Sequence, residues 1–154
     1  MGPTNNLSYL VQHLAAVMGR QTDQLLQEQL DIGLSQFKIL MVLEWNPRVQ
    51  QKAIADALGQ TESSISRQLK LLKDKKLLVT KQDSQNRRRH ITTPTPQGMQ
   101  VTEAATALMR RNMGPEFAGL GDEQLAYLVA GLQRLHRIVC QPGKIGACDH
   151  PLGL

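Results

Sequence analysis

The chain contains no apolar run of 18 residues, so no segment is long enough to cross a membrane as a helix. The opening residues, MGPTNNLSYL, also lack the charged start and apolar middle of a signal peptide. These two absences predict a cytoplasmic protein with no membrane partner. If the chain binds DNA, we expect it to be associated with the nucleoid.

Aromatic residues are scarce, because the 154 residues include one Trp, two Phe and two Tyr. A core must therefore be built mainly from Leu, Ile, Val, Met and Ala, a set rich in helix formers. The length suits one domain, or one domain with an added oligomerisation element. Composition and length together predict a mainly α fold.

Motifs of the common enzyme classes are missing as well. The sequence has no nucleophile elbow, no phosphate-binding loop, no HExxH motif and no convincing pair of acids. Ser63, Ser64 and Ser66 form a cluster of hydroxyls, but no histidine lies in the same segment to activate them. We therefore expect neither an enzyme nor a bound cofactor.

Positive charge is present, but it is concentrated in one segment. The net charge is +5, whereas Arg67 to His90 holds nine cations against two carboxylates, which gives +7. The rest of the chain holds nine cations against eleven carboxylates, which gives −2. A phosphate backbone is the natural partner, because each neutralised phosphate releases counterions. The alternative is a solvated surface that serves solubility. The nine cations are Arg67, Lys70, Lys73, Lys75, Lys76, Lys81, Arg87, Arg88 and Arg89.

The first of these cations lie in a predicted helix-turn-helix. We expect helices over residues 50–58 and 61–76, joined by a tight turn at 59–61. Gly59 supplies the left-handed residue that ends the first helix, and Thr61 caps the second. An ordinary αα-hairpin uses the same turn chemistry, but the basic, serine-rich outer face disfavours it.

The outer face of the second helix suits insertion into a major groove. Arg67 is the main candidate for a base contact, because arginine forks are the commonest specific readers of guanine. Its alternative role is a surface ion pair with Asp74 or another acid. Lys70 and Lys73 act as point charges and are expected to touch phosphates. The candidate DNA-binding residues of this helix are Ser63, Ser64, Ser66, Arg67, Lys70 and Lys73.

A β-hairpin is predicted next, with strands at residues 77–81 and 90–93. Arg87, Arg88 and Arg89 lie near its tip, where their charges stay in water. Such a tip reaches a minor groove or flanking phosphates, and DNA screens the mutual repulsion of the arginines. A helix-turn-helix followed by this hairpin is a winged helix.

Further helices are expected on both sides of the winged helix. A long helix covers residues 7–30, and Leu34 begins a shorter helix with Ser35 as its N-cap. After the hairpin, Thr95 caps a helix that Gly114-Pro115 breaks or kinks. The last helix covers residues 122–139, where apolar residues advance by three and four, the rhythm of a helix–helix seam.

The end helices exceed the cover that one small winged helix needs, so we expect a homodimer. Such a pair would place two reading heads roughly 34 Å apart on DNA. The predicted fold is mainly α: a winged helix-turn-helix, with a small β-hairpin wing, plus N- and C-terminal dimerisation helices. The predicted units are an N-terminal dimerisation helix at 1–32, a winged-helix lobe at 33–95, C-terminal dimerisation helices at 96–140 and an irregular tail at 141–154.

From about Leu7 to Val139 the sequence resembles the MarR family of bacterial transcriptional regulators. The likeness is specific, because its motifs follow one another along the chain with the spacing that the family has. They are Leu34-Ser35-Gln36-Phe37 with Leu40, Ile54-Ala55 with Leu58, Ser64-Ile65-Ser66-Arg67 with Leu69, Asn86-Arg87-Arg88, and Thr95-Pro96-Gln97-Gly98.

The resemblance implies a homodimer that binds a pseudo-palindromic DNA operator as a repressor. It also implies release of the DNA by a small lipophilic or phenolic effector, or by an oxidant. A ligand pocket would lie between the dimer helices and the DNA-binding lobe, with His13, Met18 and Trp45 as possible wall residues. Two positions depart from the family, because Asn86 stands where an Asp usually pins the wing arginine and Pro94 replaces an aliphatic residue.

Two cysteines, Cys140 and Cys148, leave several readings open. Together with His136 and His150 they supply four potential zinc ligands, although the spacing is not that of a standard finger. The other readings are a redox switch and two thiols without a role in a reducing cytoplasm. For the whole chain, the alternative function is a helical protein-interaction module that lacks DNA binding.

Overall fold

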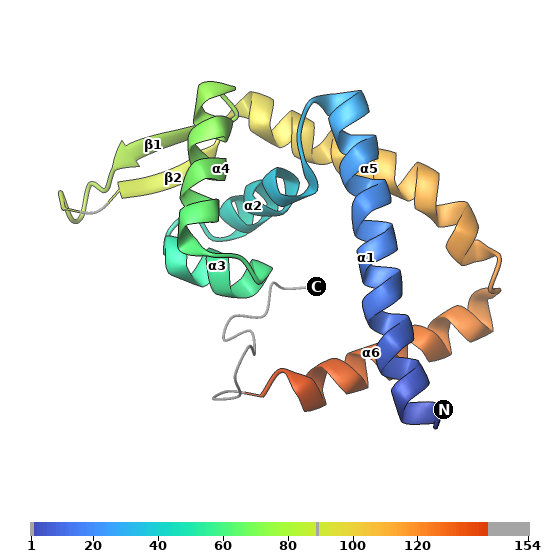
Figure 1. Cartoon of the computed structure of the whole chain (residues 1–154). Helices are drawn as coiled ribbons and strands as arrows, with labels where there is room; N and C mark the ends of the chain where they lie inside the picture. The colour runs from blue at the N-terminus through green and yellow to red at the C-terminus, as the bar shows by residue number, and fades with distance from the viewer. Residues whose placement is uncertain (1, 89, 142–154) are drawn as a thin grey trace.

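The computed structural model describes residues 2–88 and 90–141, and in them it contains six helices and one antiparallel pair of strands (Figure 1). The predicted fold, a mainly α winged helix-turn-helix, is confirmed. In chain order the elements are α1 Pro3–Leu30, α2 Leu34–Trp45, α3 Gln51–Leu58, α4 Glu62–Asp74, β1 Leu78–Gln82, β2 His90–Pro94, α5 Pro96–Ala118 and α6 Asp122–Val139.

The first helix begins four residues earlier than predicted, at Pro3. Proline suits this position, because its fixed φ matches a helix and its missing N–H would be unpaired there anyway. The helix ends at Asp31, whose φ of 54° is left-handed and whose N–H donates to Gln27 O at 3.1 Å.

The prediction that Ser35 caps α2 is wrong, because Gly33 is the N-cap. Two side chains bond to the backbone at this helix start. Asp23 Oδ1 of α1 accepts from Leu34 N at 2.7 Å, and Gln36 Oε1 accepts from Gly33 N at 3.2 Å. Since other groups pair with these amides, the Ser35 hydroxyl is available for a different contact.

The helix-turn-helix forms as predicted between α3 and α4. Gly59 has a φ of 62°, in the left-handed region that a residue with a Cβ adopts only under strain. Thr61 caps α4, because its hydroxyl accepts from Ser64 N at 3.2 Å. The turn therefore depends on the two residues that the sequence assigned to it.

The wing is formed by β1 and β2, each within one residue of its predicted bounds. The strands are antiparallel, with Leu78 opposite Pro94 and Gln82 opposite His90. Pro94 lies on the last rung, where the loss of its N–H costs the ladder least. Figure 1 shows the hairpin projecting from the same lobe as α4 and away from α6.

The joint between the wing and α5 is tight. Thr95 caps α5 as predicted, with its Oγ1 accepting from Gly98 N at 3.0 Å, and the same hydroxyl lies 2.7 Å from Lys76 O. A Cβ on Gly98 would stand 2.2 Å from Leu77 O, so this position has no room for a side chain. The wing base and the start of α5 are thus held in direct backbone contact.

The predicted interruption at Gly114-Pro115 does not end α5, which continues to Ala118. Pro115 loses its own backbone donor, but its carbonyl accepts from Gly119 N at 3.1 Å, so the final turn stays bonded. The chain reverses only at Gly121, whose φ is 76°.

One apolar core joins α2, α3, α4 and β1 with the end of α1 and part of α5. It includes Leu26 of α1 and Ala105 of α5. The buried apolar residues are Leu26, Ile32, Phe37, Ile39, Leu40, Val42, Leu43, Ile54, Ala55, Ile65, Leu72, Leu77, Leu78, Ala105 and Leu108.

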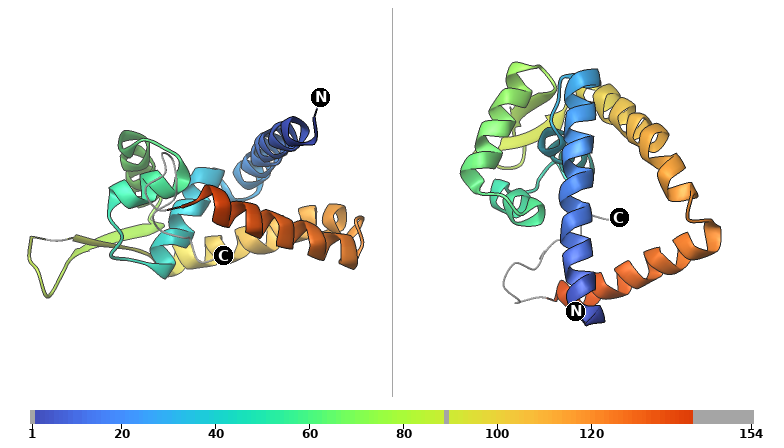
Figure 2. Two further views of the ribbon diagram at one scale, coloured as in Figure 1. Left: turned by 90° about the horizontal axis from the view of Figure 1, so that it is seen from below. Right: turned by 45° about the vertical axis from the view of Figure 1, so that its right-hand side comes forward.

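The helices at the two ends of the chain lie outside this core. No residue of α6 is buried, and Figure 2 shows α6 extending beyond the lobe. The first half of α1 is exposed in the same way, with Leu7, Leu10 and Leu14 between 43% and 52% exposed. Among the described residues, no helix has the length and apolarity that crossing a membrane requires.

Candidate nucleic-acid interface

The candidate interface begins with the outer face of α4. Ile65 and Leu72 are fully buried on the inner side of this helix. At 100° per residue, the exposed candidate serines and cations fall within an arc of about 120° on the other side, which the exposed Asp74 shares. Since they share one face, a single duplex can contact all of them. They are Ser63, Ser66, Arg67, Lys70 and Lys73.

Ser64, also a candidate, is placed differently. Its side chain is half-buried, and its hydroxyl donates to Gln60 Oε1 at 3.2 Å. Ser63 stays exposed, with its Oγ 3.0 Å from the Thr61 hydroxyl. The structure therefore brings Ser63 and Ser66 to the outer face and turns Ser64 toward the helix-turn-helix.

Arg67 has the freedom that a DNA-contacting arginine needs. The alternative was an ion pair with Asp74, but in the described part of the chain the one ion pair joins Lys75 to Asp31. The Arg67 side chain is exposed, so binding a base or a phosphate would not first require breaking an intramolecular contact.

Lys75 has a structural role that the sequence did not reveal. Its Nζ lies 2.9 Å from Asp31 Oδ2 and also donates to Asp31 O, so it joins the end of α4 to the end of α1. Because Asp31 is distant in sequence, charge counting alone did not separate Lys75 from the other cations of the basic segment.

The wing tip is shaped by two Asx-type turns. Asp83, only 3% exposed, accepts from Gln85 N at 2.9 Å, and Asn86 Oδ1 accepts from Arg88 N at 3.1 Å. Asn86, in place of the usual acid, thus orders the backbone beside Arg88. Arg87 and Arg88 are exposed at the tip, while Arg89 lies outside the described residues.

An open cavity of about 450 Å³ lies between α1, α2 and the helix-turn-helix. None of the three residues expected at a pocket lines it. His13 stacks on Tyr9 with ring centroids 5.5 Å apart, and Trp45 is 75% exposed. Met18 is half-buried on α1. The cavity is lined by Ala15, Ala16, Gly19, Arg20, Asp23, Leu34, Ser35, Lys38 and Gln60.

The cysteine hypotheses stay predictions. Cys140 follows α6 and is half-buried, with His136 one turn before it. Cys148 and His150 lie outside the described residues, so neither the zinc site nor the cysteine pairing has been tested.

Glutamines supply contacts that the sequence analysis missed. Gln60 bonds to Ser35 and Ser64, and Gln36 Nε2 donates to Gln68 Oε1 at 3.0 Å. These contacts tie α2 to α4. No periodicity signals the contacts of Gln60 with Ser35 and of Gln36 with Gln68, because each joins residues that are far apart in the chain.

Known proteins resemble this chain in sequence. A model of the MarR family matches residues 30–89, which include α2 to the wing tip. A protein of Thauera aromatica named "Putative transcriptional regulatory protein for hcr operon" is 31% identical over 101 residues. That match covers 66% of this chain, and the chain spans only 61% of the length of this relative.

Solved structures match over more of the chain. The S. aureus MepR–DNA complex has a TM-score of 0.68 at 29% identity, and the match covers 84% of this chain and 94% of that one. The M. tuberculosis MarR family protein Rv2887, in complex with p-aminosalicylic acid, has a TM-score of 0.71. At 21% identity, over 84% of this chain and 97% of that one, the second likeness concerns the fold alone.

Proposed function

Because the chain belongs to the MarR family of winged helix-turn-helix DNA-binding transcription regulators, we propose that it is a homodimeric repressor of a pseudo-palindromic operator. This family is not one of enzymes, in agreement with the missing catalytic motifs. We further propose that a small ligand or an oxidant releases the DNA.

One observation carries the proposal of direct DNA reading. The exposed cations of α4 have no carboxylate partner in the described residues, and they share a lobe with the projecting wing. A row of unpaired cations on a recognition helix fits a major groove, whereas a protein-interaction surface would gain nothing from repelling itself.

The candidate residues divide by the kind of contact they make. Arg67 reads a base edge, because its fork can bond to two guanine acceptors at once. Lys70 and Lys73 hold phosphates, and Ser63 and Ser66 add hydrogen bonds near the groove wall. Arg87 and Arg88 reach the minor groove or flanking phosphates from the wing.

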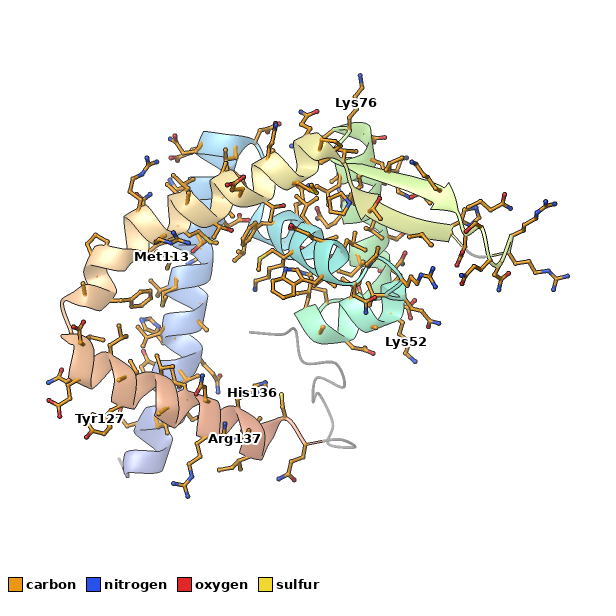
Figure 3. All side chains as sticks on the ribbon, turned by 180° about the vertical axis from the view of Figure 1, so that it is seen from behind. Lys52, Lys76, Met113, Tyr127, His136 and Arg137 are labelled. Carbon is orange, nitrogen blue, oxygen red and sulfur yellow. The ribbon has the colours of Figure 1, made fainter. Side chains whose placement is uncertain are left out.

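The uncovered helices support the proposal of a homodimer. Exposed apolar side chains on α6 include Tyr127, Leu128 and Leu132, at 73%, 48% and 44% exposure, and Tyr127 points outward in Figure 3. Monomers rarely leave so many large apolar side chains of one helix in water. A second copy would cover it with the same surface and would set the two lobes roughly one helical turn apart on DNA.

The open cavity is the proposed effector site. Arg20 and Lys38 give its wall positive charge, while the single carboxylate there, Asp23, already accepts from Leu34 N and Gln27 Nε2. This setting suits a small aromatic acid or phenol. The complex of Rv2887 with p-aminosalicylic acid makes that compound a rational first probe.

The central experiment selects bound fragments from genomic DNA and then titrates the selected duplex against salt. We expect fragments with two half-sites about 10 bp apart. We also expect log affinity to fall steeply and linearly with log salt concentration, with a slope near −0.9 per contacted phosphate. Absence of duplex binding, or a flat salt response, would favour the interaction module instead.

Release is tested on the same complexes. Addition of p-aminosalicylate should weaken binding of the unsubstituted protein, and a Lys38→Ala variant should respond less because one cation of the cavity wall is gone. Peroxide treatment with thiol titration addresses the oxidant alternative. Unchanged binding under both treatments would remove effector control by these two routes.

A further inference from the structure

Two hydrogen-bonded bridges connect the start of α2 with α4. In the first, the Gln60 side chain lies between Ser35 of α2 and Ser64 of α4. In the second, Gln36 Nε2 of α2 donates to Gln68 Oε1 of α4 at 3.0 Å. Gln36 is itself fixed, since it is 7% exposed and its Oε1 accepts from Gly33 N.

Gln60 uses both ends of its amide. The Nε2 atom donates to Ser35 Oγ at 2.9 Å, and the Oε1 atom accepts from Ser64 Oγ at 3.2 Å. Its backbone N–H donates to Ala55 O at 2.9 Å, which anchors the residue to the end of α3. One half-buried side chain therefore touches α2 and α4 while its backbone is held by α3.

These bridges restrict the rotation of α4 about its own axis, which apolar packing alone does not fix. Burial of Ile65 and Leu72 presses α4 against the core, but the hydrophobic effect has no direction. Hydrogen bonds weaken steeply when their angle is wrong, so they resist rotation of a helix about its own axis. Arg67 follows Ser64 by three residues, so this rotation decides where the guanidinium points.

We propose that Gln60 is a positioning residue for DNA reading: through Ser35 and Ser64 it sets the rotation of α4 relative to α2, and thereby the direction of Arg67. The inference rests on the proposed function, because it assigns a role in the same interface. It differs from a DNA contact, since Gln60 need not touch the duplex.

The first test replaces Gln60 with methionine, which keeps the length of the side chain and removes its hydrogen bonds. The matched control is Gln24→Met, because the Gln24 amide bonds only to Glu28 within α1 among the described residues. We expect Gln60→Met to lower affinity for the selected operator about threefold to tenfold, the worth of roughly one net hydrogen bond. Affinity for a random duplex should not change. Equal operator affinity in the two variants would overturn the proposal.

A double-mutant cycle separates positioning from direct contact. Ser35→Ala and Ser64→Ala remove opposite ends of the same bridge, and no contact joins the two hydroxyls directly. If both act through Gln60, the double variant should lose little more affinity than either single variant. Losses that multiply independently would mean that Ser64 touches the DNA itself and that the bridge does not set the helix.

Amide hydrogen exchange without DNA gives a second readout. In Gln60→Met, the first turn of α4 should exchange faster, whereas α1 and α6 should not change. Unaltered exchange in α4 overturns the inference whatever the DNA result. Failure of the unsubstituted protein to bind any duplex instead overturns the proposed function, so the two failures are told apart.

Discussion

The winged-helix lobe and the end helices bury their apolar residues in opposite ways. In the lobe, Ile39, Leu40, Ile65 and Leu72 are all 0% exposed. In α6 nothing is buried, and Val139 is 56% exposed. The lobe is thus completed by contacts within one chain, while the end helices present apolar side chains that stay exposed among the described residues.

This difference separates two properties of the protein. The shape of a reading head is encoded in one copy, because its core closes inside the lobe. In the proposed homodimer, the placement of two heads on DNA depends on the exposed apolar surface of the end helices and on a second copy. Substitutions in the two regions should therefore change different measurements, which leads to four predictions.

The largest effect is expected inside the lobe. Ile65→Ala removes a side chain that is 0% exposed and leaves a cavity beneath α4. We expect a loss of about 2–5 kcal/mol in the free energy of unfolding, measured by urea titration. The loss should be the same at every protein concentration. A concentration-dependent loss would mean that the lobe also relies on the partner.

The next effect concerns assembly. A Leu128→Glu/Leu132→Glu double variant places two charges on the predicted seam of α6. We expect a monomer in analytical ultracentrifugation, an intact helical spectrum, and operator affinity lowered about 100-fold because the two half-sites no longer act together.

Gln133→Glu is the matched control for the double variant. It adds a charge on the same exposed helix, but about 100° or more around it from Leu128 and Leu132. This control should stay dimeric and bind normally. A double variant that remains dimeric would place the interface elsewhere.

Within the lobe, substitutions of Arg67 and of Lys70 should have different kinds of effect on DNA binding. Arg67→Ala should cost about 1–3 kcal/mol of operator binding and relax the choice of one base, whereas Lys70→Ala should weaken all duplexes alike and reduce the salt slope by about 1. Mobility shifts with a panel of single-base operator variants measure both. As control, Arg110→Ala removes an equal charge from α5, and it should change neither quantity.

The smallest effect is a gain. Lys76 follows α4 with a φ of 60°, and its side chain points away from the lobe (Figure 3). Lys76→Gly should raise the free energy of unfolding by roughly 0.5–1 kcal/mol, because glycine adopts this conformation without strain. Lys52→Gly, in the first turn of α3, should instead lower it by up to about 1 kcal/mol. Thermal unfolding of both variants checks the contrast in sign.

Features encoded by neighbouring residues were predictable from the sequence. Gly59 and Thr61 specify the helix-turn-helix locally, and Thr95 with Pro96 specifies the start of α5, because caps and turns depend on residues within one helical turn. The exposed row on α4 follows from helical periodicity alone.

Features that depend on distant partners were not predictable. Asp23 of α1 caps α2 and displaces the role expected of Ser35, and Asp31 engages Lys75 across the lobe. The residues next to Ser35 and Lys75 in the sequence do not indicate those contacts. For the same reason periodicity predicted that Leu128 and Leu132 are apolar seam positions, but it could not say that the other described elements leave them exposed.

The absence of a side chain at Gly98 has a consequence for spacing. Gly98 lies close to Leu77 O, and the Thr95 hydroxyl bonds to both Lys76 O and Gly98 N. The wing and α5 can therefore move little relative to each other. In the proposed homodimer this rigid joint keeps the two winged-helix lobes at a fixed separation. One extra base pair between half-sites would turn one of them by about 35° around the duplex. That half-site would then no longer face the lobe that binds it. A promoter could then tune its control by insertion or deletion alone, without altering a single contacted base.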